Sequence, residues 1–311
     1  MNVRCLLVLL SATALFGETR VLRLANTVLV KDLQEIATLV RVITEGPGLV
    51  LDSEQKSITV SGTAEQLTAA AWIVEQLDRE VALPGTLAFP GASDDVIALF
   101  TLPDLNASVE LNEAATVARS MGRWHRLFVY TRLNAMVVRG TASDIAMAGW
   151  IFSELNLKQG WTAKLEYRSV SGGDDAVRIF HLKAGREPRQ LQELVTVVRS
   201  IGMVERMFTF TPRNLVAARG SDAEIALCEW LIGELDGGSR RPGPEYKFAG
   251  DMVRIFYLAA DDSVQHVQQV ALKLRTVTKV PRLFTYNPLR AIVVRGTAEQ
   301  LATAEQILAA K

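Results

Sequence analysis

The sequence predicts an α+β fold of four tandem βαββα modules, each with two helices packed on a three-stranded sheet. The first observation is a repeated motif, in which a short apolar strand leads through a Gly-Thr or Gly-Ser turn into an amphipathic helix. Its copies are Lys56–Asp78, Asn134–Asn156, Asn214–Asp236 and Arg290–Lys311. The second observation is the period, because the glycines of the turn are 78, 80 and 76 residues apart: Gly62, Gly140, Gly220 and Gly296. Four copies of one module thus fill the chain of 311 residues, and its function has to be sought in the module.

Linker composition places the boundaries between the modules. Gly, Pro and charged residues are concentrated near residues 80–95, 156–176 and 237–252, which is typical of connections between domains. We therefore expect the modules at 18–79, 80–155, 156–236 and 237–311.

Residues 1–17 are expected to form a cleaved signal peptide. Arg4 precedes an apolar run, 6–16, which is too short to span a bilayer and suits a secretory signal. The alternative for this run is a short buried segment. No later stretch approaches the length of a membrane span, so we expect a periplasmic mature chain without one.

Each copy is predicted to run strand, helix, strand, strand, helix. In the third copy the elements are Val177–Leu182, Pro188–Ser200, Arg206–Phe210, Leu215–Arg219 and Ala223–Leu235. In the fourth copy they are Val253–Leu258, Asp262–Thr276, Arg282–Tyr286, Ala291–Arg295 and Ala298–Ala310. The hairpin turns contain Thr211-Pro212 and Asn287-Pro288, which are strong breakers between β-prone runs. Ser221 and Thr297 are good N-caps for the second helix.

The hairpin strands carry arginines at fixed positions in copies two to four. One arginine begins the second strand and another ends the third, as the pairs Arg126 and Arg139, Arg206 and Arg219, and Arg282 and Arg295. If the turn pairs Tyr130 with Ala135, Arg126 lies opposite Arg139, and the other copies give the same register. Like charges directly opposite each other destabilise a sheet unless a carboxylate or a ligand lies between them.

The same face of the hairpin carries aromatic residues, while the opposite face is expected to pack on the module's own helices. The aromatic residues are Phe128, Tyr130, Phe208, Phe210, Phe284 and Tyr286. We interpret this face as a candidate interaction surface, which packs against a neighbouring module or a partner protein. Two alternatives remain, a stacking platform for single-stranded nucleic acid and an inverted assignment of the two faces.

Three tryptophans recur in the second helix, at the tenth position after the module glycine. Trp72, Trp150 and Trp230 lie roughly 160° around the helix from the stripe that faces their own core, and the fourth copy has Gln306 there. We expect each tryptophan to pack under the segment that follows it and so to join consecutive modules. Carbohydrate stacking is the weaker alternative.

The chain shows no pattern typical of catalysis. His125, His181 and His266 occupy unrelated module positions without metal-ligand spacing, and no nucleophile elbow, phosphate loop or zinc signature occurs. Cys228 replaces an alanine of the other copies, and Cys5 falls in the expected signal peptide, so no internal disulfide is expected. We predict a protein that is not an enzyme, with no catalytic, cofactor-binding or metal-binding residues and no cofactor.

The repeated motif resembles the N-domains of bacterial secretins, the outer-membrane proteins of type II and type III secretion and of type IV pili. It covers about four-fifths of this chain as the four copies, although KH-like and other ring-building modules share the βαββα order. The resemblance implies periplasmic modules that self-associate or contact envelope secretion components. A secretin continues into an outer-membrane β-barrel, whereas this sequence ends at Lys311, so we expect a free-standing relative without the barrel.

Two other functions remain open. The repeated arginines could bind peptidoglycan or lipid headgroups as an envelope-binding module. A KH-like nucleic-acid binder is the weakest alternative, because no Gly-x-x-Gly loop occurs between the helices and because the formal net charge is zero. We therefore expect protein partners and no nucleic acid.

Overall fold

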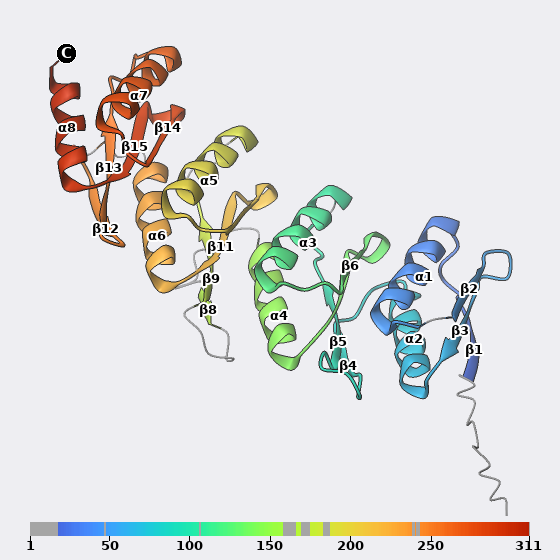
Figure 1. The fold of residues 1–311 in the computed structure, drawn as a ribbon. Coiled ribbons are helices and arrows are strands. Elements are labelled where there is room, and N and C mark those ends of the chain that lie inside the picture. The colour runs from blue at the N-terminus through green and yellow to red at the C-terminus, as the bar shows by residue number, and fades with distance from the viewer. Residues whose placement is uncertain are drawn as a thin grey trace, which may run out of the picture.

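The computed structural model places the modules one after another along an elongated array (Figure 1). It describes residues 18–46, 48–105, 107–157, 166–168, 175–182, 187–237, 240 and 243–310, so the expected signal peptide lies outside the described residues. No helix in the described part is both long and apolar enough to cross a membrane.

Each module has the predicted order of elements. The first contains β1 (Glu18–Arg23), α1 (Val30–Thr44), β2 (Gly48–Asp52), β3 (Ser57–Gly62) and α2 (Ala64–Leu77). The second contains β4 (Gly85–Ala88), β5 (Val96–Thr101), α3 (Ser108–Gly122), β6 (Leu127–Tyr130), β7 (Ala135–Gly140) and α4 (Ala142–Asn156). The third contains β8 (Glu166–Arg168), β9 (Ala176–His181), α5 (Pro188–Gly202), β10 (Arg206–Phe210), β11 (Leu215–Gly220) and α6 (Asp222–Asp236). The fourth contains β12 (Glu245–Phe248), β13 (Asp251–Tyr257), α7 (Val264–Thr278), β14 (Arg282–Tyr286), β15 (Ala291–Gly296) and α8 (Ala298–Ala309).

The sheets are antiparallel, and the third module strand lies at their centre. In the described residues the strand orders are β1-β3-β2, β4-β5-β7-β6, β8-β9-β11-β10 and β12-β13-β15-β14. The predicted three strands are present throughout, and modules two to four add a short strand, β4, β8 or β12, on the outer side of the first module strand. These added strands lie in the linkers near 80–95, 156–176 and 237–252, for which the sequence analysis predicted no strand.

Sheet residues that face away from their own helices belong to the core of the preceding module. The core around α1 and α2 includes Tyr130, Ala135 and Val137 from the second sheet. The core around α3 and α4 includes Phe210 and Leu215 from the third sheet. The core around α5 and α6 includes Tyr286 and Val293 from the fourth. Sheets two to four are therefore covered on both faces, whereas the described residues place no helices over the outer face of the first sheet.

The local signals explain where the second helices begin. Thr63, Thr141, Ser221 and Thr297 each form a capping box with the residue three positions later, which satisfies exposed backbone N–H groups at the helix start. The module glycine precedes each cap closely. At Gly140, a Cβ atom would lie 2.8 Å from the side chain of Asp144, so the capping residue needs the space that glycine leaves.

Candidate functional site: the joints between modules

The hairpin face with the recurrent aromatic residues packs on the preceding module. Tyr130, Phe210 and Tyr286 are fully buried, at 0% exposure, and Phe128, Phe208 and Phe284 are half-buried. This face therefore packs against a neighbouring module, which is one of the two interpretations made from the sequence, and the alternative of a platform for stacked bases is corrected. The helices of the preceding module have an apolar surface that their own sheet does not cover. The hairpin face of the next module packs against that surface.

The arginine pairs have the predicted register. Arg206 pairs with Arg219 and Arg282 with Arg295 across the antiparallel strands, and the backbone N–H of Arg139 donates to the carbonyl of Arg126 at 2.9 Å. Carboxylates offset the repulsion between these like charges, as the register requires.

An aspartate at the start of the first module strand supplies this compensating charge. In module two, Asp94 accepts hydrogen bonds from both Arg126 and Arg139, the latter at 2.8 Å. In module three, Asp175 binds Arg219 at 2.7 Å.

In module four, Asp251 fills the same role, because its Oδ2 lies 2.9 Å from Nε of Arg295. The ring of Phe248 lies beside this guanidinium, 4.7 Å away. In module two the ring of Phe89 is 4.0 Å from the guanidinium of Arg139, so cation–π contacts add to the ion pairs.

The same arginines cap the C-terminus of the first helix of the preceding module. Arg139 donates to the carbonyl of Ile43 at 2.7 Å, and Arg295 donates to that of Ile201 at 3.1 Å. Arg219 donates to the equivalent carbonyl, that of Met121. The last carbonyls of a helix have no partner within the helix and carry its negative dipole end, so a guanidinium satisfies both their bonding and their charge.

The first helix is also held near its N-terminal end, by a recurring glutamate. Glu113 accepts a hydrogen bond from the backbone N–H of Thr211 at 2.7 Å, and Glu193 accepts one from that of Asn287 at 2.6 Å. Glu35 accepts bonds from both the N–H and the hydroxyl of Thr131, each at 3.2 Å. In each case the donor begins the 3-10 turn of the next hairpin. Burial raises the pKa of Glu35, and the bonds from Thr131 partly oppose that shift.

We call each of these contact regions a joint. A joint consists of the first helix of one module, with its glutamate, together with the arginine pair, aspartate and 3-10 turn of the next module. The described residues form three joints: the first between modules one and two, the second between two and three, and the third between three and four.

The recurrent tryptophans lie against the added edge strands. The ring of Trp150 is 5.7 Å from that of Tyr167 in β8, and the ring of Trp230 is 5.3 Å from that of Tyr246 in β12, centroid to centroid. Trp72 lies beside Gly85 in β4. Each tryptophan therefore contacts the strand that follows its own helix, which is the geometry expected from the sequence.

The two end modules lack the joint residues on their outward faces. Where sheet two has Arg126, Arg139 and Tyr130, the first sheet has Gly48, Ser61 and Asp52, according to the strand registers. Where the other first helices have the glutamate and a buried apolar residue, α7 has Gln269 and an exposed Lys273. These faces could not form a further joint of the same kind, as is usual for terminal repeats.

A further arginine near the end of the first helix protects an edge strand. Arg119 donates to the carbonyl of Leu127 at 2.7 Å, and Arg275 donates to that of Leu283 at 2.7 Å. β6 and β14 are edge strands, and unpaired edge groups invite pairing with another chain. These arginines therefore occupy carbonyl groups that the edge strands would otherwise leave unpaired.

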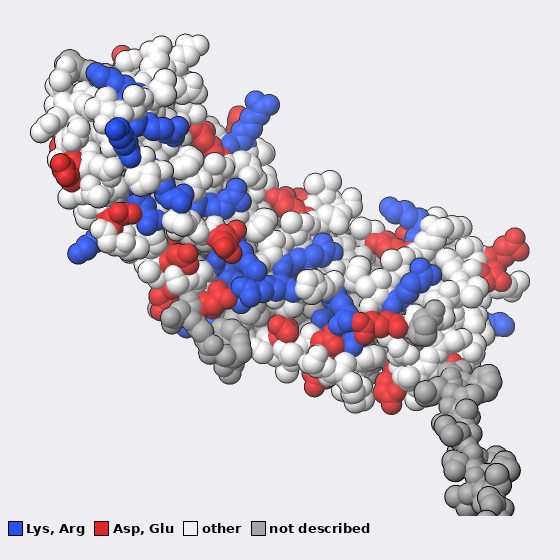
Figure 2. All heavy atoms as spheres, in the orientation of Figure 1, with Lys and Arg blue, Asp and Glu red and all other residues white. Residues whose placement is uncertain are grey.

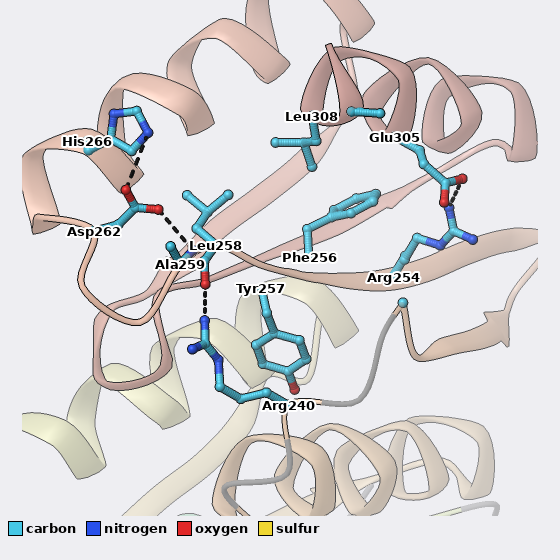
Figure 3. A pocket seen from close by; sticks show the side chains of 12 residues that line it. Arg240, Arg254, Phe256, Tyr257, Leu258, Ala259, Asp262, His266, Glu305 and Leu308 are labelled. Carbon is cyan, nitrogen blue, oxygen red and sulfur yellow. Dashed lines mark hydrogen bonds and ion pairs between the residues drawn. The ribbon is translucent and has the colours of Figure 1, made fainter. Parts of the chain in front are cut away.

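The fourth module has a hollow of about 860 Å³, whose lining includes Arg254, Asp262, His266 and Glu305 (Figure 3). Its polar groups are engaged with one another, since Arg254 binds Glu305 at 2.7 Å and Asp262 accepts from the N–H of Ala259 at 2.9 Å. His266 Nε2 is 3.7 Å from Asp262 Oδ1, too far for a hydrogen bond.

Among the described residues there is no cluster of three or more potential metal ligands. Burial raises the pKa of Cys228, so this thiol is a core residue and not a nucleophile.

Two features of the joints were missed at the sequence level. The glutamate of the first helix recurs in three copies, as Glu35, Glu113 and Glu193, and is replaced by Gln269 in the fourth. This is the distribution already noted for the tryptophans and Gln306, and it would have been a usable signal. An aspartate likewise recurs just before or at the first strand in copies two to four, as Asp94, Asp175 and Asp251.

Comparison with known proteins gives matches among solved structures only. No family model and no curated protein matches the chain. ExeD from Aeromonas hydrophila is 17% identical over 77% of this chain and 43% of its own, with a TM-score of 0.18. The N-terminal domain of the secretin XcpQ from Pseudomonas aeruginosa is 15% identical over 45% of this chain and 62% of its own, with a TM-score of 0.20.

The type II secretion system secretin GspD from E. coli K12 is 13% identical over 76% of this chain and 41% of its own, with a TM-score of 0.17. The chain therefore resembles secretin N-terminal domains, as its motif suggested, and it spans less than two thirds of each of these three chains.

Proposed function

We propose that this chain is a non-enzymatic scaffold, exported to the periplasm, that assists an envelope secretion or pilus system by binding protein partners along a rigid array of modules. The observation that carries the proposal is the repeated use of one residue set in all three joints. The recurring arginines and glutamates bind the neighbouring module, and the recurring aspartates bind those arginines within their own module. Because the recurrent polar residues hold each module against the next, we expect the array to keep a fixed shape.

The secretory system is suggested by the motif and by the apolar N-terminal run, as set out from the sequence. The alternative of an envelope-binding module rested on exposed repeated arginines. The burial of Arg139 and Arg295, at 3% and 8% exposure, counts against that alternative for the hairpin arginines.

Complementation in the native host tests the scaffold directly. Deletion of the gene should lower protein secretion or piliation, and the wild-type chain should restore it. The double variant Arg126→Glu, Arg139→Glu places acids opposite Asp94 and beside the carbonyl end of α1, so it should open the first joint and fail to complement. The matched variant Arg20→Glu, Arg23→Glu carries the same charge change in β1 and should complement.

Two results would refute the scaffold. One is a deletion strain with normal secretion and pili, and the other is full complementation by the open-joint variant. Self-association is a separate question, which light scattering of the purified chain across concentration answers: a discrete oligomer indicates assembly from several copies, and a constant monomer mass indicates an adaptor.

A further inference from the structure

One backbone position distinguishes the second joint from the others. The residue after the first helix adopts a left-handed conformation in every module, and it is Glu45, Arg123, Met203 or Lys279, with φ between 53° and 62°. In the first joint, Glu45 forms ion pairs with both Arg126 and Arg139. In the second joint, Arg123 occupies this position, so the acid of the first joint is replaced by a third arginine.

This replacement leaves excess positive charge at the second joint. In the first joint the two arginines face two carboxylates, those of Glu45 and Asp94. In the described part of the second joint, four arginines, Arg123, Arg206, Arg219 and Arg295, line the same hollow as three carboxylates, those of Asp175, Glu205 and Glu224. The Asp175 carboxylate is bound to Arg219 at 2.7 Å and is 4.0 Å from Arg123. Lys and Arg atoms gather visibly midway along the array, with acidic atoms beside them (Figure 2).

Arg206 is held less firmly than the equivalent arginine of the third joint. Its described hydrogen bond is to the carbonyl of Ser120 at 3.5 Å, whereas the equivalent Arg282 donates to that of Ser200 at 2.9 Å. Burial lowers the pKa of Arg206, and repulsion from Arg123 and Arg219 lowers it further. An anion placed among these guanidinium groups would relieve that repulsion.

The arginines line a groove that consists of two adjoining hollows. A hollow of about 670 Å³ is bounded by Arg119, Trp124 and Phe208, and another of about 540 Å³ is bounded by Arg219 and Arg295. The two hollows share three lining residues, Arg123, Glu205 and Arg206. The groove therefore runs from the second module, past the second joint, to the start of the fourth.

The pattern of charge selects among anionic ligands. Glu205, Asp175 and Glu224 lie between the arginines, so a continuous phosphate backbone would meet repulsion at intervals. Trp124 is only 6% exposed and offers no free face for a base. A peptide can place acidic side chains at the arginines and neutral or basic ones at the carboxylates, which fits both signs of charge.

We propose that this groove binds an extended acidic peptide segment of a protein partner. The inference rests on the proposed function as a scaffold for proteins, and it assigns the chemistry of one partner. The contacts are charge-assisted hydrogen bonds from Arg123 and Arg206 to aspartate or glutamate side chains. Binding therefore weakens as the salt concentration rises.

Fluorescence anisotropy tests the groove with defined probes and the full purified chain. The probe is a labelled peptide of alternating glutamate and glycine, and the comparison probes are the glutamine–glycine peptide of equal length and an oligothymidylate. We expect the glutamate peptide to bind more tightly than either, with an affinity that falls as salt is added.

The decisive variant is Arg123→Glu, with Arg123→Gln as an intermediate. The first joint has glutamate in this left-handed position, so the backbone accepts the change. Reversing the charge should weaken peptide binding by about tenfold or more. The matched control is Lys279→Glu, at the equivalent position of α7 and outside the groove lining, and it should change the affinity by less than about twofold.

Several outcomes would refute the proposal that this groove binds an acidic peptide. They are undetectable binding of the glutamate peptide, equal losses in Arg123→Glu and Lys279→Glu, and tighter binding of the oligothymidylate, which would indicate a nucleic-acid site. The scaffold function is tested separately. If Arg123→Glu complements the deletion fully and the open-joint variant does not, the proposal that the groove binds a peptide is refuted and the proposed scaffold function is supported.

Discussion

The outer face of the first sheet and the equivalent faces of the other three sheets come from the same repeat, yet they carry different residues. On the inner sheets this face has buried aromatic residues and an arginine pair that binds the preceding helix. On the first sheet it has Gly48, Ser61 and Asp52 at the equivalent positions, with Val21 and Val50 exposed at 55% and 67%. The same divergence occurs at the other end, in the outer face of α7. The joint residues are therefore present only where the described structure has a neighbouring module, which identifies them as elements of assembly and not of the module fold itself.

The largest expected effect comes from the buried arginine of the first joint. Arg139→Ala leaves the carbonyl of Ile43 without its donor and leaves Asp94 with Arg126 as its remaining arginine partner, and should cost about 2–3 kcal/mol of stability. Ser61→Ala, at the equivalent position of the first sheet, should cost less than about 0.5 kcal/mol. Urea unfolding followed by circular dichroism measures both. Equal costs would mean that the arginine acts on the module fold and not on the joint.

The glutamate of the third joint gives a medium effect. Glu193→Gln replaces a charged acceptor by the residue that α7 already has at this position, and should cost about 1.5 kcal/mol through the weaker bond to the N–H of Asn287. The reverse change, Gln269→Glu, adds a charge to an outer face and should be nearly neutral. Hydrogen exchange of the Asn287 amide reports the joint directly. Unchanged protection of that amide in Glu193→Gln would contradict the assigned bond.

The tryptophan contact comes next in size. Trp230→Ala removes the ring contact with Tyr246, which is worth about 1 kcal/mol beyond the area that it buries, and should release β12 from the edge of its sheet. Gln306→Ala, at the same module position in α8, should leave stability unchanged. Hydrogen exchange in 245–248 is the measurement, and retained protection in Trp230→Ala would contradict this role.

The smallest effect concerns acid sensitivity of the second joint. The hydrogen bond from Arg219 lowers the pKa of Asp175 below its usual 3.8. A lowered carboxyl pKa stabilises the folded state above pH 3.8 and loses that contribution as the pH falls through the folded-state value. Wild type should therefore melt above Asp175→Asn at neutral pH, and the difference should shrink near about pH 3. A difference independent of pH would rule out the charged pair as its source.

Much of the fold was available from the sequence because the repeat averages local signals over four copies. Glycine spacing and hairpin breakers placed the elements, and the alternation of Leu127 and Val129 with Phe128 and Tyr130 placed the two faces of the hairpin. The register predicted opposed arginines and the need for a carboxylate between them, although it did not identify Asp94, Asp175 and Asp251 as that carboxylate.

The joints were harder to predict, because their chemistry lies between modules. Glu193 binds a backbone N–H 94 residues later in the chain, and no local pattern specifies the residue that lies opposite it. The added strands β4, β8 and β12 have only three or four residues each. They form against a sheet edge and, in β8 and β12, beside a tryptophan, so their linker composition did not reveal them.

The sharing of cores between modules has a consequence for how the chain acquires its structure during synthesis. The helices α1 and α2 obtain their full core only when Tyr130, Ala135 and Val137 are in place, so the first module stays incomplete until the second hairpin has left the ribosome. The same delay applies at each later step. We therefore expect the modules to fold in order from the N-terminus as the chain emerges. Each new hairpin completes the core of the module before it.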